Sequence, residues 1–464
     1  MTVHVYSGPT LPAARVRELL PAAVCHPPIQ HGDLIRLDAA PGDTVVILDG
    51  LWHQSAPVRH KEILSLLAAG VRVVGAASMG ALRAVELAPY GMVGVGRIFE
   101  DLAAGVLDAD DEVAVLHIPE GAPLTEALVN IRCALAGCAA AGHITDADAQ
   151  ALEVLARALP FTRRSWAALA RAARDQGAGP AFAELDRWCH QHPHDQKRQD
   201  AEQALTLVAA AALPSSAEAS PWADDATWRT SFVRYWHAVH RPGPGGVPFA
   251  AALQHQQLYD PEFPGRWRAR VLTAIAAPDT SPAEVETAAV RAATTEGVTV
   301  AAMSRQQLAH WLTPAEIRTL DPDEQLIRLM VRSARLDGAW SVWPTSPAEA
   351  GELFNGALPS AAAVTAAYAV NAAVEAADPR HTTARLSPDR IARHLAARWN
   401  LPPCARQPQQ DAAARDRAFR NFTGAVEVAR AFYLGARTEP EATAAGSTSA
   451  ACSSCPPAMA SPRI

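Results

Sequence analysis

Three short segments in the first eighty residues end in residue types that can perform nucleophilic or acid–base chemistry. Ser7 begins the sequence Ser-Gly-Pro-Thr, and Asp49 directly precedes a glycine. Ser78 stands immediately before Met79 and Gly80. Each follows an apolar run typical of a buried strand. Because ligands of parallel sheets bind outside the carboxyl ends of the strands, we expect these side chains to meet at one edge.

Ser78 occupies a predicted strand-to-helix turn. The amides of Met79 and Gly80 would be unpaired donors at the start of the helix, where they could stabilise an oxyanion. Alternatively, Ser78 only caps the helix predicted over residues 79–87. The G-x-S-x-G pattern of a nucleophile elbow is absent, so the sequence leaves both interpretations open.

Two cationic side chains follow the strand that ends at Asp49. His60 and Lys61 fall in the first turns of a helix predicted over residues 58–69. A cation at a helix N-terminus is unfavourable, which predicts a depressed pKa for Lys61; a solvated lysine is the alternative. Arg83 either pairs with Glu86, three residues along the next helix, or binds an anionic ligand.

Further polar and glycine-rich segments carry weaker signals. The run Asp110, Asp111 and Glu112, with His117, could supply a carboxylate and an imidazole for acid–base chemistry, and a solvated acidic turn is the alternative for Asp110. The glycines of residues 91–96 do not match a dinucleotide-binding pattern and predict close approach of backbone. The cysteine and histidines of residues 189–194, and the Cys452/Cys455 pair, match no complete zinc spacing, so we predict no metal site.

The elements that must position these residues form two regions. In residues 1–144, apolar strands alternate with helices, which predicts a parallel-sheet α/β sandwich covered on both faces. The predicted strands are 4–7, 33–37, 44–48 and 71–77, and the predicted helices are 11–20, 58–69, 79–87 and 124–141. Residues 145–437 are alanine-rich with a period of 3.6 and predict an all-α, tryptophan-rich domain of unknown role. Residues 438–464 are of low complexity and predict a disordered tail.

Composition narrows the class of protein. The chain has 464 residues and is 49% hydrophobic, which excludes a mainly disordered protein. A net charge of −7 disfavours broad nucleic-acid binding. The start of the chain has no secretory signal pattern, and no apolar stretch approaches 18 residues. The chain has seven cysteines, an odd and low number that argues against a disulfide framework. Together these features predict a cytoplasmic protein without a membrane partner.

Taken in order, the motifs resemble the core of the TfuA-like family over about residues 1–135. The matching segments are Ser-Gly-Pro-Thr at 7–10, Asp-Gly at 49–50, His-Lys-Glu-Ile at 60–63, the ten residues 75–84, the glycine run 91–96, Asp-Glu-Val-Ala at 111–114 and Val-Asn-Ile-Arg at 129–132. The remaining two-thirds of the chain resembles no family that we identify.

The resemblance implies a role in peptide thioamidation. TfuA-like proteins partner YcaO enzymes, which use ATP to activate a backbone amide in ribosomal peptide natural products. The TfuA-like partner supplies sulfide by hydrolysing a thiocarboxylated carrier of the ThiS type. We therefore expect a hydrolase without a cofactor of its own. Its expected partners are a YcaO-family protein, a ThiS-like carrier and a precursor peptide.

The residues that match the family motifs receive roles on this basis. Ser78 is the expected nucleophile or oxyanion helper, Lys61 the expected base, and Asp49 and His60 the orienting groups. We expect the glycines to leave a narrow channel for the carrier's Gly-Gly tail. The expected substrate-binding residues are Ser7, Gly8, Met79, Gly80, Arg83, Asp111 and Glu112.

Two other functions compete with this one. The protein could be a non-catalytic scaffold or allosteric activator that binds YcaO and the precursor peptide. It could also be a nucleotide- or phosphate-binding α/β protein that uses the amides at residues 78–80.

Overall fold

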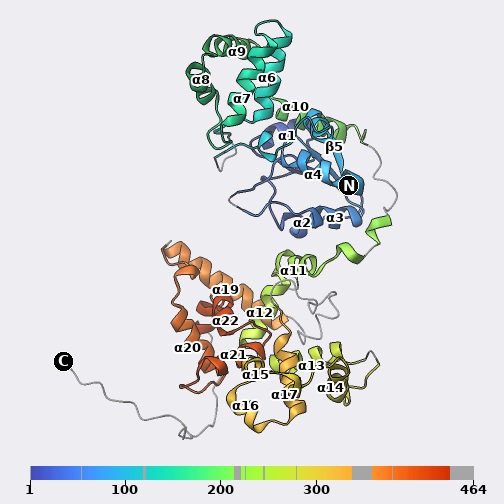
Figure 1. Ribbon diagram of the computed structural model, residues 1–464, viewed down its shortest axis with the longest axis vertical. Coiled ribbons are helices and arrows are strands. Elements are labelled where there is room, and N and C mark those ends of the chain that lie inside the picture. The colour runs from blue at the N-terminus through green and yellow to red at the C-terminus, as the bar shows by residue number, and fades with distance from the viewer. Residues whose placement is uncertain are drawn as a thin grey trace, which may run out of the picture. The chain divides into compact units, whose positions relative to one another are not determined.

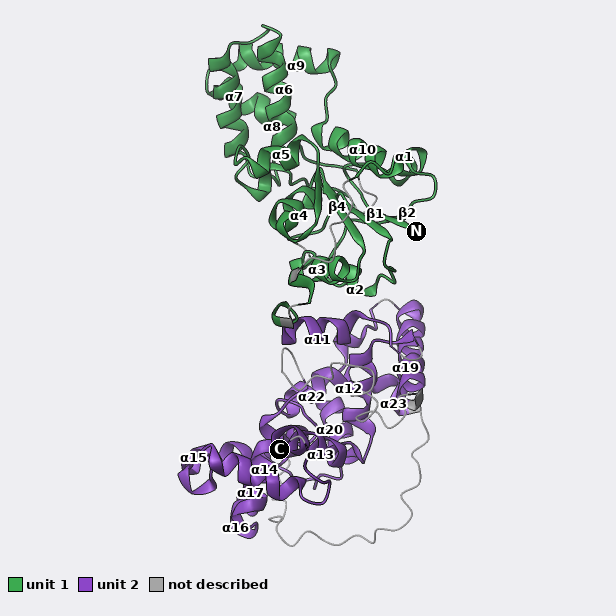
Figure 2. Cartoon of the chain, turned by 90° about the vertical axis from the view of Figure 1, so that its right-hand side faces the viewer, with its two compact units in different colours: residues 1–229 green, residues 230–464 purple. Residues whose placement is uncertain are grey.

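The computed structural model describes residues 2–53, 55–118, 122–213, 221–224, 226–243, 246–277, 279–336, 358–378 and 380–438. The chain divides into two compact units, residues 1–229 and 230–464 (Figures 1 and 2). The division predicted at residue 144 stays a prediction. Most of the predicted disordered tail, residues 439–464 with Cys452 and Cys455, lies outside the described residues.

A five-stranded parallel sheet forms the centre of the first unit, in the order β2-β1-β3-β4-β5. Its strands are β1 (Val3–Tyr6), β2 (Val24–His26), β3 (Thr44–Ile47), β4 (Arg72–Ala76) and β5 (Val93–Val95). The predicted parallel α/β architecture is confirmed. Because the strand order reverses between β1 and β3, the ends of these two strands mark the switch point of the sheet.

Helices cover both faces of this sheet. Figure 2 shows α1 (Ala13–Leu19) and α10 (Gln196–Ala209) on one side and α2 (Asp33–Arg36) and α3 (His60–Ala68) on the other. Helix α4 (Met79–Leu87) packs on the same face as α3. Alternate strand residues point to opposite faces, and helices bury both faces, so apolar residues follow one another along a strand. Fully buried side chains on the α10 face include Val5, Val46, Val74, Ala201 and Leu205.

Short segments account for the differences from the predicted elements. Residues 33–37 were expected to be a strand, but Asp33–Arg36 form a helical turn. The carboxylate of Asp33 accepts a hydrogen bond from the Gln30 amide at 2.8 Å, which favours this turn. Strands β2 and β5 have three residues each and were not predicted, since such runs show no measurable period.

Four further helices of the first unit form a bundle with its own core. They are α6 (Leu128–Ala140), α7 (Asp146–Ala158), α8 (Trp166–Asp175) and α9 (Gly179–Gln191), and α5 (Arg97–Ala103) precedes them. Their buried side chains include Ile131, Leu152, Leu169 and Leu185. Helix α10 then returns to the sheet (Figure 1), although the sequence placed it in the all-α region.

The described residues of the second unit form helices and no strand, as predicted for this region. The α-helices are α11 (Ser231–His240), α12 (Phe249–Tyr259), α13 (Phe263–Ile275), α14 (Val285–Thr295), α15 (Arg305–Trp311), α16 (Pro314–Thr319), α17 (Pro322–Ser333), α19 (Leu358–Ala377), α20 (Pro388–Arg398), α21 (Gln407–Arg415), α22 (Phe422–Ala429) and α23 (Tyr433–Thr438). Trp267 is fully buried in their core. Among the described residues, no helix is long and apolar enough to cross a membrane.

Two glycines bring α4 into close contact with the sheet. A Cβ on Gly80 would lie 1.7 Å from the Ile47 carbonyl oxygen, and one on Gly75 would lie 2.1 Å from the Gly80 carbonyl oxygen. Both distances are far inside van der Waals contact. Glycine at these positions therefore lets α4 begin directly against β3 and β4, which fixes where Ser78 stands.

This contact predicts a large loss of stability in G80A. Overpacking a well-packed site costs about 1–3 kcal/mol, so G80A should lower the free energy of unfolding of the first unit by that amount. The matched control is G179A, because a Cβ there has no contact shorter than 3.4 Å. Urea denaturation followed by circular dichroism measures both variants. An equal effect of the two substitutions would contradict this account of Gly80.

Candidate functional site

The carboxylate of Asp49 ties together the two strand ends at the switch point. Its Oδ2 accepts hydrogen bonds from the amides of Gly8 at 2.8 Å and Thr10 at 3.0 Å. Its Oδ1 accepts one from the Thr10 hydroxyl at 2.5 Å. The Asp49 residue is only 2% exposed. Three donors therefore satisfy a buried carboxylate and fix the loop after β1 over the end of β3.

The other residues of this loop have local partners. The Ser7 hydroxyl donates to the Leu11 carbonyl at 2.5 Å. Gly8 lies against Pro28, because a Cβ on Gly8 would stand 2.5 Å from the proline Cγ. The structure therefore brings Ser7 and Gly8 to the predicted sheet edge, where both take part in the turn around Asp49.

Ser78 stands on a tight turn between β4 and α4. Ala77 has a φ of 67°, and the Ser78 amide donates to the Ala76 carbonyl at 2.8 Å. A positive φ is uncommon for alanine and marks local backbone strain. The Ser78 side chain makes no capping hydrogen bond to α4. Its hydroxyl instead donates to the Val113 carbonyl at 3.4 Å, so the helix-cap alternative does not describe this serine.

The start of α4 offers fewer donors than the sequence suggested. The Gly80 amide donates to the Leu48 carbonyl at 3.3 Å and is thereby occupied. Within the described part of the chain, the Met79 amide has no backbone acceptor. Of the two predicted oxyanion donors, Met79 is therefore the one that stays available at this helix N-terminus.

Lys197, at the start of α10, is the functional candidate that the sequence analysis missed. Lys197 is only 4% exposed, and its Nζ donates a hydrogen bond to the Val113 carbonyl at 2.9 Å. The lysine amine and the Ser78 hydroxyl thus share one acceptor. Burial lowers the pKa of the Lys197 amine, and the negative charges of Asp49, Asp195 and Glu126 oppose this shift.

A compositional signal could have revealed this residue. The chain contains 41 basic residues, and all except Lys61 and Lys197 are arginines. Arginine cannot be deprotonated in a protein, whereas a buried lysine can lose its proton. A lysine in a chain that otherwise uses arginine is therefore a candidate for acid–base chemistry. The sequence analysis placed Lys197 in the all-α region of residues 145–437, away from the sheet.

The first turn of α10 is fixed by side chains of α6. The Asn130 Oδ1 accepts a hydrogen bond from the Gln196 amide at 3.0 Å, and its Nδ2 donates to Asp195 at 3.1 Å. Asp200, one turn further along α10, accepts hydrogen bonds from the amides that begin α5. These contacts hold the backbone of Lys197 in place against the sheet.

The Val113 carbonyl is positioned by the two carboxylates that precede it. Asp111 accepts a hydrogen bond from the fully buried Arg164 at 2.7 Å, and Glu112 accepts one from Arg132 at 2.8 Å. Burial raises the pKa of Glu112. In the structure both acidic residues therefore bind arginines, Arg132 on α6 and Arg164 in the loop before α8, and they act on the site through Val113.

His60 and Arg83 form a separate cluster. The His60 Nε2 lies 2.8 Å from a Glu86 carboxylate oxygen, and Arg83 donates to the same oxygen at 2.5 Å. These two contacts hold the pKa of Glu86 down against the opposing effect of its burial. The hydrogen bonds of Ser78 and Asp49 include neither His60 nor Lys61. The structure thus links Ser78 to Lys197 through the Val113 carbonyl, with the charge of Asp49 acting on the lysine amine. His60 instead contacts Glu86 and Arg83.

Three of the glycines expected to line a channel, Gly50, Gly94 and Gly96, lie in close contact with other side chains. A Cβ on Gly50 would stand 2.7 Å from the Met79 Cγ, and one on Gly94 would stand 2.1 Å from the Phe99 ring. A Cβ on Gly96 would stand 2.4 Å from Asp200. These three glycines therefore permit close packing of α4, α5 and α10, and the channel for a Gly-Gly tail stays a prediction.

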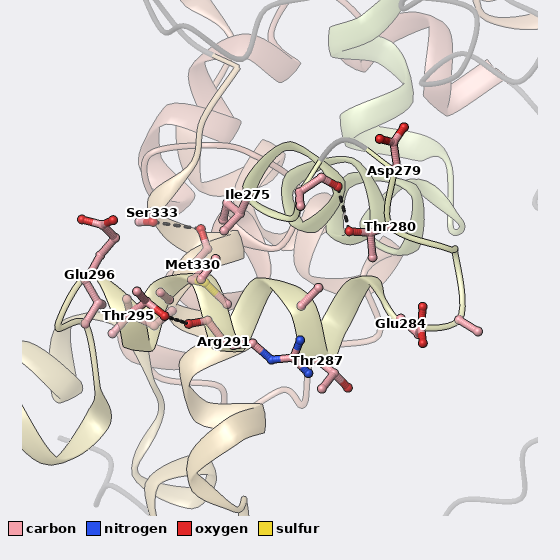
Figure 3. Close-up of a pocket in the computed structure, with 17 residues that line it drawn as sticks. Ile275, Asp279, Thr280, Glu284, Thr287, Arg291, Thr295, Glu296, Met330 and Ser333 are labelled. Atoms are coloured by element: carbon pink, nitrogen blue, oxygen red, sulfur yellow. Dashed lines mark hydrogen bonds between the residues drawn. The ribbon is translucent and has the colours of Figure 1, made fainter.

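The second unit contains an open pocket of about 1300 Å³ between α13, α14 and α17 (Figure 3). Thr280, Thr295 and Ser333 each donate a hydrogen bond to a nearby backbone carbonyl. Figure 3 shows these hydroxyls directed at their own chain segments. All residues that line this pocket belong to the second unit, whereas Asp49 belongs to the first.

The fold and the site together define a doubly wound α/β protein with a buried serine, lysine and aspartate group at the carboxyl end of its sheet. The model of the TfuA-like protein family matches residues 49–165, about a quarter of the chain. This stretch is similar to the TfuA-like family, as the ordered motifs predicted. Ser7–Thr10 and Lys197 lie outside the matched residues. No curated protein matches the chain.

The contacts of Asp49 predict the effect of T10V. The substitution removes a hydroxyl donor from a buried carboxylate, and a hydrogen bond to a charged group contributes about 1.5–3 kcal/mol. T10V should therefore lower the free energy of unfolding of the first unit by about that amount. The control is T206V, whose hydroxyl donates to the Glu202 carbonyl at an exposed position. Similar losses in the two variants, measured by urea denaturation, would contradict the role given to Asp49.

Proposed function

We propose that this protein supplies sulfur to a YcaO enzyme that thioamidates a peptide backbone. In this proposal it hydrolyses a thiocarboxylated carrier of the ThiS type and releases sulfide during biosynthesis of a ribosomal peptide natural product. The TfuA-like domain supports association with a YcaO protein. The observation that carries the proposal is the Ser78 hydroxyl, which caps no helix and shares the Val113 carbonyl with a buried lysine.

The chemistry required is acyl transfer. A nucleophile attacks the thiocarboxylate carbon of the carrier, and negative charge develops on the carbonyl oxygen. The amide of Met79 at the start of α4 can stabilise that charge. Overall, the thiocarboxylate and one water give a carboxylate, a hydrosulfide ion and a proton. The ATP-dependent activation of the peptide amide belongs to the YcaO enzyme, so no cofactor is assigned to this chain.

The expected partners follow from this division of the reaction. The YcaO enzyme receives the sulfide, the carrier delivers it, and the precursor peptide is the final acceptor. In this proposal the helical second unit is the part of the chain that binds YcaO or the peptide, because the first unit contains the acyl-transfer site.

A second candidate function is a non-catalytic scaffold or allosteric activator of YcaO. The burial of the site favours it, because Ser78 is 9% exposed and Asp49 is 2% exposed. A carrier tail would have to displace the Val113 carbonyl from the Ser78 hydroxyl, and the loop of Gly8 and Thr10 from the Asp49 carboxylate, to reach these groups. The purified protein, incubated alone with a thiocarboxylated carrier, separates the two functions, since only a hydrolase releases sulfide without YcaO. The third candidate, phosphate binding at residues 78–80, is weakened because the Gly80 amide is already occupied.

The hydrolase proposal predicts that S78A abolishes sulfide release. Removing a catalytic nucleophile typically lowers kcat by more than about 10³-fold. The control is S65A, because the Ser65 hydroxyl donates to the Lys61 carbonyl within α3 at 2.7 Å. Sulfide is measured colorimetrically after mixing each variant with the carrier thiocarboxylate. Release by S78A at the rate of the unsubstituted protein would refute the proposal, provided that both variants keep the same circular dichroism spectrum.

A further inference from the structure

We propose that Lys197 is the general base that activates Ser78, so that the two residues form a serine–lysine catalytic pair completed by a helix outside the TfuA-like match. This inference rests on the proposed hydrolase function and names the residue that makes the serine a nucleophile. The sequence analysis had assigned the base to Lys61.

The geometry of one carbonyl group carries the inference. The Ser78 hydroxyl lies 3.4 Å and the Lys197 amine 2.9 Å from the Val113 carbonyl oxygen. The two side chains are therefore linked through one carbonyl oxygen, and in this structure the Ser78 hydroxyl hydrogen-bonds to Val113 and not to Nζ. In the proposed reaction the hydroxyl leaves Val113, turns toward Nζ and passes its proton to the amine. Such a proton transfer is the role of a general base beside a serine.

The surroundings of Lys197 suit an amine that must become neutral. The residue is buried, and the only hydrogen bond that its amine makes among the described residues is to Val113. Burial lowers its pKa, while Asp49 on β3, Glu126 before α6 and Asp195 before α10 raise it. The amine therefore loses its proton at a lower pH than an exposed lysine, and its lone pair becomes available to Ser78.

Supporting contacts hold both partners of the pair. Arg164 and Arg132 fix Asp111 and Glu112, and this fixes the carbonyl of the next residue, Val113. Asn130 holds the amide that precedes Lys197. Packing alone does not account for an amine that shares the Val113 acceptor with the serine of a strained turn.

The reaction balances with these two residues, the carrier and water. The Ser78 oxygen forms a bond to the thiocarboxylate carbon while Lys197 takes the hydroxyl proton. The carbon–sulfur bond then breaks, and Lys197 returns the proton to the departing sulfur, which leaves as hydrosulfide. Water attacks the serine ester, with Lys197 taking a proton from water and passing it to the serine oxygen. The carrier leaves as a carboxylate and one proton is released to solvent.

His60 and Lys61 do not fit this role as well as Lys197. The His60 ring pairs with Glu86 at a half-exposed position. Neither His60 nor Lys61 shares an acceptor with the Ser78 hydroxyl, whose hydrogen bond is to Val113. The lysine at position 61 remains in the experiment as the alternative base.

The test compares K197M with two other substitutions in the full-length protein. Methionine keeps the length and apolar stem of lysine but cannot accept a proton. K197M should lower the rate of sulfide release from a ThiS-type carrier thiocarboxylate by about 10²-fold or more, with KM little changed. R198M, on the same helix and paired with Glu202 at an exposed position, should stay within about twofold of the unsubstituted protein. Normal release by K197M, or a comparable loss in K61M but not K197M, would overturn the inference.

A second readout separates a catalytic role from a structural one. The rate of the unsubstituted protein should rise with pH as the amine of Lys197 loses its proton, and this rise should vanish in K197M. The melting temperature of K197M should not fall, because the substitution removes a buried charge. A variant that melts at the same temperature and keeps the same rise with pH would show that another group is the base.

A third readout keeps the inference testable if the carrier is wrong. A small fluorophosphonate, which reacts with activated serines, should label Ser78, with a mass increase located by peptide mass spectrometry. Labelling should be slower by about 10²-fold in K197M and unchanged in R198M. Labelling without any sulfide release would contradict the proposed function and leave the pair intact. Absence of labelling, or equal labelling of K197M, would contradict the pair itself.

Discussion

The carbonyl of Val113 is the point on which the arrangement of the site depends. It is the acceptor for a serine hydroxyl from the turn after β4 and for a lysine amine from α10. A buried amine without a hydrogen-bond acceptor would lower the stability of the fold. Lys197 can therefore be buried beside the sheet because the Val113 carbonyl accepts a hydrogen bond from its amine. The acidic residues before Val113 matter for the same reason, since their arginine partners hold the segment still. Asp111 and Glu112, which the sequence suggested for ligand binding, thus bind arginines in this structure and position the Val113 carbonyl.

Asp49 has a comparable role at the neighbouring strand ends. Three hydrogen bonds to the loop after β1 join β1 and β3 where the sheet changes direction. In sheets of this topology the same place is where ligands bind. The structure therefore combines a structural carboxylate with a candidate catalytic serine. The negative charge of Asp49 also acts on the amine of Lys197, which links the two halves of the site electrostatically.

The sequence predicted the elements with long apolar runs and missed those without them. Strands β3 and β4 and the helix after Ser78 were found because continuous valine, isoleucine and leucine residues mark a buried parallel strand. The segment 33–37 was misassigned because five residues are too few to distinguish a helical period from a strand period. The convergence of Ser7, Asp49 and Ser78 on one edge followed from topology alone. The position of Lys197 could not be predicted from topology, because it depends on the return of α10 to the sheet. That helix begins more than a hundred residues after Ser78.

That return has a consequence for how the protein can be divided. The residues matched by the TfuA-like family end at position 165, before α10 begins. A fragment that ends at residue 165 would lack Ala201 and Leu205, so Val46 and Val74 would be exposed to water. Exposed apolar surface of this kind favours self-association. The matched stretch is therefore shorter than the set of elements that packs around the sheet, which includes β1, β2 and α10.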